Sequence, residues 1–457
     1  MAMKKKEIIL WVLVALALAA NIWLPKQHRK YSWERDLSQR LAADFCATRE
    51  EVKDYVKNYI PDVTDAQIDE WTASGKLENM QIGKETRYFN HAGPNLFRIV
   101  PELVEIKAKA EGEAQGTLSG RQKDDADIIP LIRADVADAI AAGSDNPYLA
   151  QKKRIRFSYS ITVPANTLRR GSTLRCWLPF PRQDVAKQTD IKLIRAGIDS
   201  VDIPESRIVH SDPACHHSSI YFETKVKEGR STTFYEVFEY TLAGEWHPID
   251  PETVLPYDKD SDLYKENTSE RSNIVFSDRI RSIADSLTRG IDNPYLQAKA
   301  IFTWVDAFPW ASAREYSTIE NIPEYVLTNG HGDCGQVTLL FMTLCRAKGI
   351  PTRWQSGFSC HPNGQNLHDW CEAYFEGCGW VPVDQSFGVS SYSDYFYFGG
   401  LDPYRLIVNN DFSGELSPAK KYPRSETVDF QRGEVEWEGG NLYFNQWDYE
   451  FDVEFLD

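Results

Sequence analysis

The 457-residue sequence lacks an excess of positive charge, with 51 Lys and Arg against 67 Asp and Glu and a formal net charge of −16. Non-specific binding to nucleic acid or to an anionic membrane surface depends on clustered basic side chains. The charge balance therefore argues against both, and we expect no nucleic-acid partner. The sequence also contains no tandem repeat, which argues against a repeat architecture.

Cysteine is sparse as well, and its eight copies lack the dense, even spacing of a disulfide scaffold. They stand at Cys46, Cys176, Cys215, Cys334, Cys345, Cys360, Cys371 and Cys378. Cys215, His216 and His217 are adjacent, but neighbouring residues on a strand point to opposite faces and no second ligand pair follows at zinc spacing. We read that segment as a surface loop and expect neither a metal nor a cofactor.

One uncharged apolar run is present near the start, at residues 8–24, after Lys4, Lys5 and Lys6. Its 17 residues are at the short end of what spans a bilayer. A signal peptide cleaved after small residues 17–19 is the other interpretation. Because the apolar run continues past those residues, we favour an uncleaved anchor. Either interpretation places the rest of the chain outside the cytoplasm, membrane-anchored, or secreted or periplasmic after cleavage.

Periodicity divides the chain into five segments. Residues 1–30 form the anchor or signal, and residues 31–143 are predicted to be mostly helical, with an exposed linker over 105–127. Residues 144–270 alternate apolar and polar side chains and predict a β-sandwich-like domain. Residues 271–400 return to helices and then strands. Residues 401–457 predict a C-terminal β segment packed on the domain before it.

A cysteine stands at the mouth of a predicted helix, in "GHGDCGQV", residues 330–337. Apolar residues recur after it at helical spacing, so Cys334 lies in the first turn and Cys345 in the core. Free N–H groups and the helix dipole at that position favour a thiolate and can hold an oxyanion. A lone cysteine of this kind is more often a buried, inert side chain.

Two later residues complete a possible catalytic set. His368 begins one predicted strand and Asp384 lies on the next, which supplies a base and an orienting carboxylate for a cysteine nucleophile. Simple hairpin pairing centred near Gly377 and Cys378 would place residue 387, not Asp384, opposite His368. A register shift is therefore expected, and Pro382 is the expected place for it, since a strand proline marks an edge or a bulge.

The stretches "GHGDCGQVTLLFMTLCRAKGIPTRW", "HDWCEAYF" and "GWVPVDQSFG" together resemble the core of the transglutaminase-like superfamily, which is related to papain-like cysteine enzymes. The resemblance covers roughly residues 277–400. It implies an α+β fold in which the cysteine helix packs on an antiparallel sheet. It also implies Cys334 as nucleophile, His368 as general base and acid, and Asp384 as the residue that orients His368.

Other residues near this pattern are weaker candidates. Animal transglutaminases place a Trp upstream of the cysteine, where this chain has Tyr316 and Ser317, with Trp310 further away. Tyr316 could donate its hydroxyl to an oxyanion, and His331 is more simply a loop residue than the base. A metal site among Cys360, His361, His368, Cys371 and Cys378 would leave Asp384 unexplained, and a disulfide within this group is the better expectation.

Two classes of function remain. The first is an extracytoplasmic cysteine enzyme that attacks an amide in a protein or peptide and forms a thioester. Hydrolysis, as in a cysteine protease or amidase, is favoured over cross-linking because no amine-acceptor site is recognisable. The second is a catalytically idle binding or scaffolding protein at the cell surface. The intact Cys, His and Asp pattern favours the enzyme.

Overall fold

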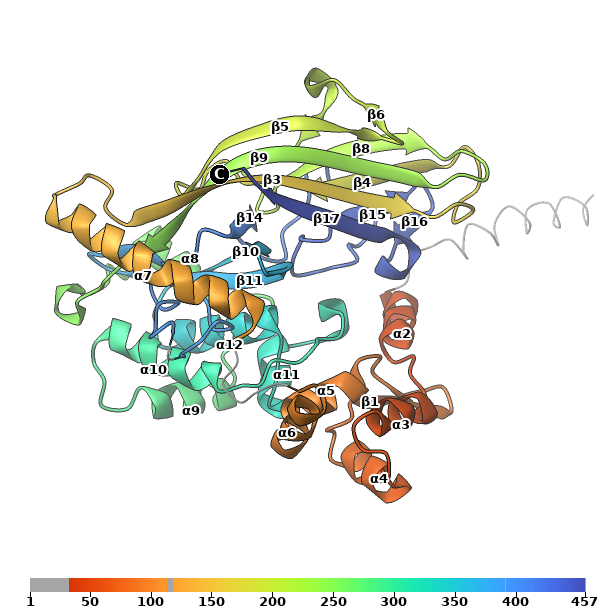
Figure 1. The fold of residues 1–457 in the computed structure, drawn as a ribbon, viewed down its shortest axis with the longest axis horizontal. Helices are drawn as coiled ribbons and strands as arrows, with labels where there is room; N and C mark the ends of the chain where they lie inside the picture. Colours follow the sequence, from red (N-terminus) through yellow and green to blue (C-terminus); the bar gives the residue numbers. More distant parts are fainter. Residues whose placement is uncertain (1–32, 113–117, 391, 457) are drawn as a thin grey trace, which may run out of the picture.

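The computed structural model describes residues 33–112, 118–390 and 392–456 of the chain (Figure 1). The apolar run at 8–24, predicted to be an anchor or a signal, lies outside these residues. Within them, no helix has both the length and the apolar character needed to cross a membrane.

The N-terminal unit is a small helical bundle with one two-stranded sheet, as the sequence predicts for most of its length. Capping boxes at Thr48 and Thr64 start two of its helices, and Phe45, Trp71 and Phe97 lie in its core. Its elements are α2 (Trp33–Asp44), α3 (Arg49–Lys57), α4 (Asp65–Ala73), β1 (Asn79–Ile82), β2 (Glu85–Tyr88), α5 (Ala92–Ile99) and α6 (Pro101–Ala110).

A long helix, α7 (Gly120–Ala141), follows this unit and crosses the molecule in front of the region formed by residues 271–400 (Figure 1). The linker expected over 105–127 is therefore wrong for both of its ends, which belong to α6 and α7. A capping box at Ser119 starts α7, and Asp125 becomes buried where its carboxylate meets His361. His361 is distant from Asp125 in the sequence. The charged residues of 105–127 therefore look exposed when that segment is considered alone.

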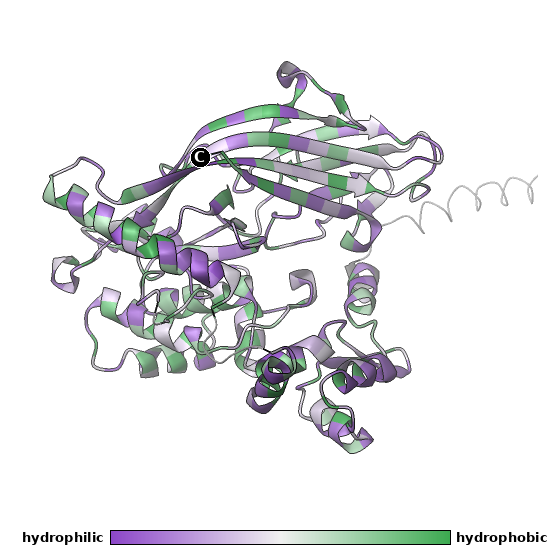
Figure 2. Ribbon diagram, in the orientation of Figure 1, coloured by the Kyte–Doolittle hydropathy of each residue, from purple (hydrophilic) through white to green (hydrophobic). Residues whose placement is uncertain are grey.

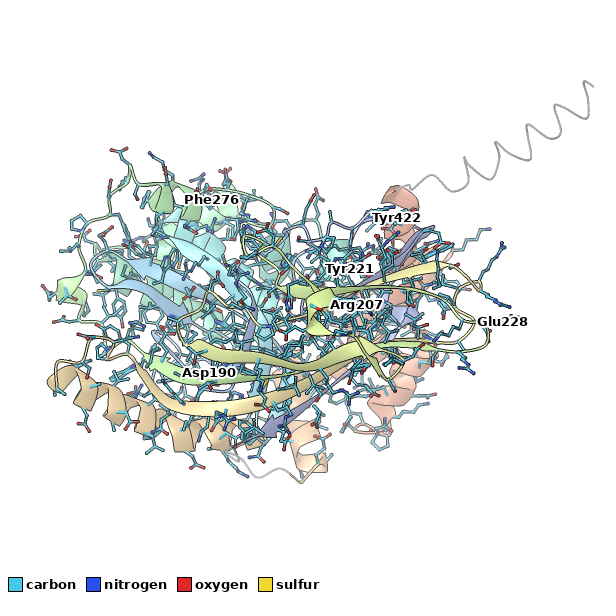
Figure 3. All side chains as sticks on the ribbon, turned by 90° about the horizontal axis from the view of Figure 1, so that it is seen from above. Asp190, Arg207, Tyr221, Glu228, Phe276 and Tyr422 are labelled. Atoms are coloured by element: carbon cyan, nitrogen blue, oxygen red, sulfur yellow. The ribbon has the colours of Figure 1, made fainter. Side chains whose placement is uncertain are left out.

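Two antiparallel sheets form the sandwich that the alternating sequence predicts, and their strands alternate hydrophilic and hydrophobic residues (Figure 2). One sheet has the order β17-β3-β9-β5-β6 with β13 on β9, and the other has β16-β15-β4-β8-β7. Their bounds are β3 (Leu149–Val163), β4 (Thr173–Pro179), β5 (Gln188–Ile198), β6 (Val201–Asp202), β7 (Val209–His210), β8 (Ser219–Lys225), β9 (Thr232–Trp246), β13 (Gly400–Leu401), β15 (Glu434–Trp437), β16 (Gly440–Leu442) and β17 (Asp448–Phe455). Figure 3 shows these strands from above, with Glu228 in the loop between β8 and β9 at one end of the molecule.

The last strands differ from expectation. Residues 401–457 are predicted to pack as one segment on the catalytic domain, but β15 pairs with β4 and β17 pairs with β3, so both complete the sandwich. The physical reason is that these alternating strands satisfy the open edges of β4 and β3. Phe451 of β17 still contacts the region formed by residues 271–400, with its ring centroid 5.2 Å from that of Phe358.

The region that contains Cys334, His368 and Asp384 consists of helices on a four-stranded antiparallel sheet of order β12-β11-β10-β14. Its central helix, α12, is buried from Gly335 to Arg346 between that sheet and the other helices. The elements are α8 (Asp262–Asn267), α9 (Asp278–Leu287), α10 (Pro294–Asp306), α11 (Ile322–Asn329), α12 (Cys334–Ala347), β10 (Thr352–His361), β11 (Gly364–Phe375), β12 (Gly379–Val383) and β14 (Arg405–Asn409), with short 3₁₀ turns η1 (Glu205–Arg207), η2 (Pro251–Thr253), η3 (Tyr316–Thr318) and η4 (Phe444–Gln446) elsewhere. The α+β fold expected from the sequence is present.

Candidate active site

Cys334 is the first residue of α12, as its position after the turn predicts. Gly330 ends α11 with φ 71°, and the chain then turns so that Asp333 caps the next helix. Asp333 Oδ1 accepts a hydrogen bond from Gln336 N at 3.0 Å, while Gln336 Oε1 accepts from Asp333 N at 3.2 Å. The capping box fixes the cysteine at the helix N-terminus.

Cys334 and His368 both line a cavity of about 420 Å³. Side chains from the loop before α11, the start of β11 and the segment before β15 surround it. The lining residues are Arg121, Trp310, Ala313, Arg314, Glu315, Tyr316, Asp333, Cys334, Asn366, Leu367, His368, Asp369, Ser386, Glu426, Asp429, Gln431 and Arg432. The candidate nucleophile and the candidate base therefore face one cavity.

His368 lies on β11, and its Nε2 is 2.7 Å from Asp384 Oδ2. Both side chains are buried. Asp384 follows the end of β12, where its backbone N–H donates to Tyr397 O at 2.9 Å. Since Nε2 is used by Asp384, Nδ1 is the ring nitrogen left for a proton from the cysteine.

The expected distortion at Pro382 is absent. Pro382 pairs in register with Glu372, and the β11–β12 ladder continues without a shift to the pair of Cys371 and Val383. Pro382 is tolerated because β12 is the edge strand of this sheet. The chain leaves the ladder after Val383 instead, and this departure turns Asp384 towards the imidazole.

Electrostatics keep His368 neutral over the physiological range. Burial lowers the pKa of His368 to about 4, against the opposing effect of Asp384. Burial also opposes the ionisation of Asp384, yet its hydrogen bond with His368 and the charge of Arg405 leave its pKa below the ordinary value. A neutral imidazole beside an ionised carboxylate is the form that can accept a proton, and the carboxylate then stabilises the imidazolium.

The thiol of Cys334 is not poised as a thiolate. Its sulfur lies 3.4 Å from Asp369 Oδ2, and the pKa of Cys334 is raised well above its ordinary value by burial and then by the carboxylates of Asp369 and Asp333. The expectation from the helix N-terminus alone is therefore wrong in direction. Burial of the thiol is the largest cause, and together with the neighbouring acidic side chains it outweighs the dipole. Asp369 follows His368 directly in the sequence, and nothing in the motif indicated that it would reach the sulfur.

The weaker candidates have distinct positions. Tyr316 donates its hydroxyl to Asp333 Oδ1 at 2.5 Å, and it therefore supports the helix cap. Trp310 lines the cavity and forms a backbone bridge with Gly332, two residues before the cysteine. His331 is buried outside the lining of the cavity, with its ring 6.3 Å from that of Tyr325. Cys345 is fully buried in the core, as predicted.

All eight cysteines are unpaired, so the disulfide expected around Cys360, Cys371 and Cys378 is wrong. Cys360 and Cys371 are buried side chains on β10 and β11. His361, from the same predicted group, is also buried, and its ring nitrogens lie 2.7 Å from Ser359 Oγ and 2.9 Å from Asp125 Oδ1. These cysteines and histidines are close together in the sequence because β10 and β11 are consecutive strands of one hairpin.

A buried ionic network begins behind His368. Arg405 lies between Asp384 Oδ2, 2.9 Å away, and Asp402 Oδ2, 2.7 Å away. Asp402 in turn lies 3.6 Å from His361 Nε2. Asp125, His361 and Asp402 are near enough to one another to hold a metal ion. Arg405 already supplies a positive charge to Asp402, so an ion network accounts for the group as it stands.

Comparison with known proteins finds a family similarity in the part of the chain that contains this site. Residues 281–385 match the transglutaminase-like superfamily. A stretch of 133 residues is 26% identical to the uncharacterised protein YebA of Bacillus subtilis (strain 168), covering 25% of this chain and only 18% of YebA.

Solved structures give weaker similarities. A candidate cysteine protease from Cytophaga hutchinsonii has a TM-score of 0.44 at 16% identity, covering 68% of this chain and 93% of that chain. The periplasmic domain of TgpA from Pseudomonas aeruginosa has a TM-score of 0.27 at 14% identity, covering 52% of this chain and 97% of that chain. Both scores are below 0.5, so the superfamily match over 281–385 is the finding that identifies the domain.

Proposed function

Because residues 281–385 form a transglutaminase-like domain, we propose that this protein is a cysteine enzyme that transfers acyl groups through a thioester on Cys334. One observation carries the proposal. Cys334, at the N-terminus of a buried helix, and His368, paired with a buried carboxylate, line the same cavity. A nucleophile, a base and a residue that orients the base are the three parts of such a site.

The reaction follows from these positions. The thiol of Cys334 turns from Asp369 towards His368 and gives its proton to Nδ1, and the resulting thiolate attacks the carbonyl carbon of a bound amide. The carbonyl π electrons move to oxygen, where free N–H groups at the start of α12 are available to hold the negative charge. Asp384 stabilises the imidazolium for as long as His368 carries the proton. The intermediate then collapses, and the leaving amine takes that proton from His368.

Water is the proposed acceptor of the acyl group, which makes the protein a protease or amidase rather than a cross-linking enzyme. His368, neutral again after the amine has left, removes a proton from water as it attacks the thioester. The substrate is a protein or peptide whose scissile bond enters the cavity of about 420 Å³. That volume accommodates a few side chains at most, which fits an extended peptide better than a folded one.

An extracytoplasmic location, with the chain tethered through residues 8–24, is part of the proposal and rests on that apolar sequence alone. Membrane fractionation of the full chain tests it, compared with a chain that begins at residue 33. We expect the full chain in the membrane fraction and the shortened chain in the supernatant. Equal distribution of the two chains between the fractions would contradict the tether.

The proposed chemistry is tested by alkylation with an iodoacetamide-type probe, followed by peptide mapping. Saturating peptide substrate should protect Cys334 from alkylation, whereas Cys215 and Cys378, which are also partly accessible, serve as internal controls. Cys334→Ser should abolish release of amine from peptides, and Cys378→Ser should not. Equal peptide turnover by the wild type and by Cys334→Ser would exclude Cys334 as the nucleophile. Binding of peptides without any turnover would favour the idle scaffold.

A further inference from the structure

Asp369 touches the atom that the proposed reaction activates, yet it belongs to none of the roles given above. Its Oδ2 lies 3.4 Å from Cys334 Sγ, and its side chain is 4% exposed. Gly335 permits this approach, because a Cβ atom at that position would lie 2.6 Å from Asp369 Oδ2. A carboxylate at that distance would oppose the thiolate on which the chemistry depends.

A second buried carboxyl group resolves this conflict. Asp429, also 4% exposed, accepts a hydrogen bond from Ser356, which is the strand partner of Asp369 across β10 and β11, so the two carboxyl groups are neighbours. Asp429 Oδ2 has no hydrogen-bond partner among the described residues and is therefore free to accept a hydrogen bond from a protonated Asp369. Two buried carboxyl groups in contact do not both ionise, and they share a single proton instead.

The hydrogen bonds around the pair decide which member keeps that proton. Asp429 Oδ1 accepts from Ser356 Oγ at 2.8 Å, Asn409 Nδ2 at 2.7 Å and its neighbour's backbone N–H. Asp369 Oδ1 accepts from the Gln431 amide. Asp369 receives fewer hydrogen-bond donors than Asp429, so the shared proton stays on Asp369.

We propose that Asp369 is a further catalytic residue, which its contact with Asp429 keeps protonated. When the thiolate forms, the carboxyl O–H of Asp369 donates a hydrogen bond to the Cys334 sulfur. In the free enzyme Asp369 Oδ2 accepts the hydrogen bond of the thiol. After His368 Nδ1 has taken the thiol proton, the Asp369 O–H turns to the sulfur anion. The hydrogen bond ends when the new S–C bond consumes the sulfur's electron pair.

The groups that face Asp369 are consistent with this arrangement. Asp429 and Gln431 face it from the segment before β15, and Asp333 and Cys334 from the start of α12. Burial and the Asp429 charge raise the pKa of Asp369 well above its ordinary value. No arginine or lysine forms an ion pair with Asp369 among the described residues, so the proton is what neutralises it.

The inference rests on the proposed cysteine chemistry, but its test needs no substrate. The rate at which Cys334 is alkylated by iodoacetamide reports the thiolate fraction, and one pKa unit changes that fraction about tenfold. Asp429→Asn removes the acceptor of the shared proton and supplies an amide donor, so Asp369 ionises. We expect Cys334 in this variant to react at least about tenfold more slowly at pH 7, with a correspondingly higher thiol pKa.

The double variant Asp369→Asn/Asp429→Asn separates this charge effect from structural damage. It keeps the Asp429→Asn change but removes the carboxylate next to the sulfur, so its Cys334 should react at least about tenfold faster than in Asp429→Asn alone. An unchanged rate in Asp429→Asn, or a double variant as slow as Asp429→Asn, would overturn the role of Asp369.

A second pair of variants decides the matter if Asp429→Asn fails to fold. Asp369→Asn retains a hydrogen-bond donor and Asp369→Leu does not, so the first should be alkylated at Cys334 several times faster than the second. Equal rates would also overturn the proposal. These ratios compare variants, whereas the proposed function fails when wild-type Cys334 shows neither substrate protection nor turnover. The two failures are therefore distinguishable.

Discussion

Arg405 Nη1 lies 2.9 Å from Asp384 Oδ2, the same carboxylate oxygen that lies 2.7 Å from His368 Nε2. All three side chains are buried, and Arg405 is also paired with Asp402. A buried cation that shares an anion with a histidine has two effects. It keeps the carboxylate ionised, and it repels a proton from the imidazole.

Arg405→Gln should therefore raise the pKa of His368. Burial is the main reason that this pKa is about 4, and the Arg405 charge contributes in the same direction. A base that must be neutral loses activity as pH falls through its pKa, so the acid limb of the activity profile should move to higher pH. The profile of kcat/KM against pH, measured with a peptide substrate, checks this expectation.

Arg405→Lys is the matched control, because it keeps a positive charge and loses only the fork geometry. Its acid limb should stay nearer to that of the wild type than the limb of Arg405→Gln. Arg405→Gln should also be less stable by about 3–5 kcal/mol, since it leaves Asp402 buried without its main partner. Identical acid limbs in both variants would show that the charge of Arg405 does not reach His368.

Asp384→Asn tests the other partner of the imidazole. The amide keeps the size of the carboxylate but cannot stabilise an imidazolium, so kcat should fall by about two to four orders of magnitude. Residual activity should still exceed that of Cys334→Ala, because the nucleophile and the helix N-terminus remain. Single-turnover rates with an activated ester, which needs less help from the base, should fall less than rates with an amide. An equal loss for both substrates would contradict the assigned role.

The two cysteines of α12 provide a contrast between function and packing. Cys345 is fully buried, whereas Cys334 is partly exposed at the cavity. Cys345→Ala should lower the free energy of unfolding by about 1 kcal/mol and keep the specific activity, because only a small buried side chain is shortened. Cys334→Ala should abolish activity with little change in stability. Denaturant unfolding and peptide turnover, measured on both variants, check the pair.

The core of the fold could be predicted from the sequence because its signals are local. The turn before Cys334 and the apolar spacing after it define α12, and His368 and Asp384 stand on short alternating strands. The contact between His368 and Asp384 could also be expected. The local structure behind this contact was predicted incorrectly. A bulge at Pro382 was expected to bring Asp384 to His368, but the end of the strand pairing after Val383 does so.

The charge environment of the site could not be predicted, because its members come from distant parts of the chain. Asp125 from α7 meets His361, and Arg405 from β14 meets Asp384. Asp429 approaches Asp369 across 60 residues of sequence. Each of these residues looks like an ordinary polar position when it is read alone. The dipole argument for Cys334 failed for a related reason, since it counted the helix and neither the burial of the thiol nor the acidic side chains that fold against it.

His331 offers a test of acid stability that also separates it from the catalytic base. Burial lowers the pKa of His331 to about 4, and its Nδ1 has no hydrogen-bond partner among the described residues. The unfolded chain takes up this proton near the ordinary value of 6.5, while the folded chain resists it until about 4. The free energy of unfolding should therefore fall as pH drops from 6.5 to 4 and be unaffected by this group above 6.5.

His331→Phe should remove that part of the acid sensitivity. The lowered pKa corresponds to at most about 3 kcal/mol by linkage, so the loss of stability between pH 7 and pH 4.5 should be smaller in the variant by about 1–3 kcal/mol. His216→Gln is the control, because the His216 ring is about half exposed. Activity at pH 7 should persist in His331→Phe, since the ring lies outside the cavity that holds Cys334. Urea unfolding at both pH values gives the comparison. If the wild type and His331→Phe lose equal stability on acidification, the buried ring is not a source of the acid sensitivity. If His331→Phe loses activity but stays folded, His331 and not His368 becomes the candidate base.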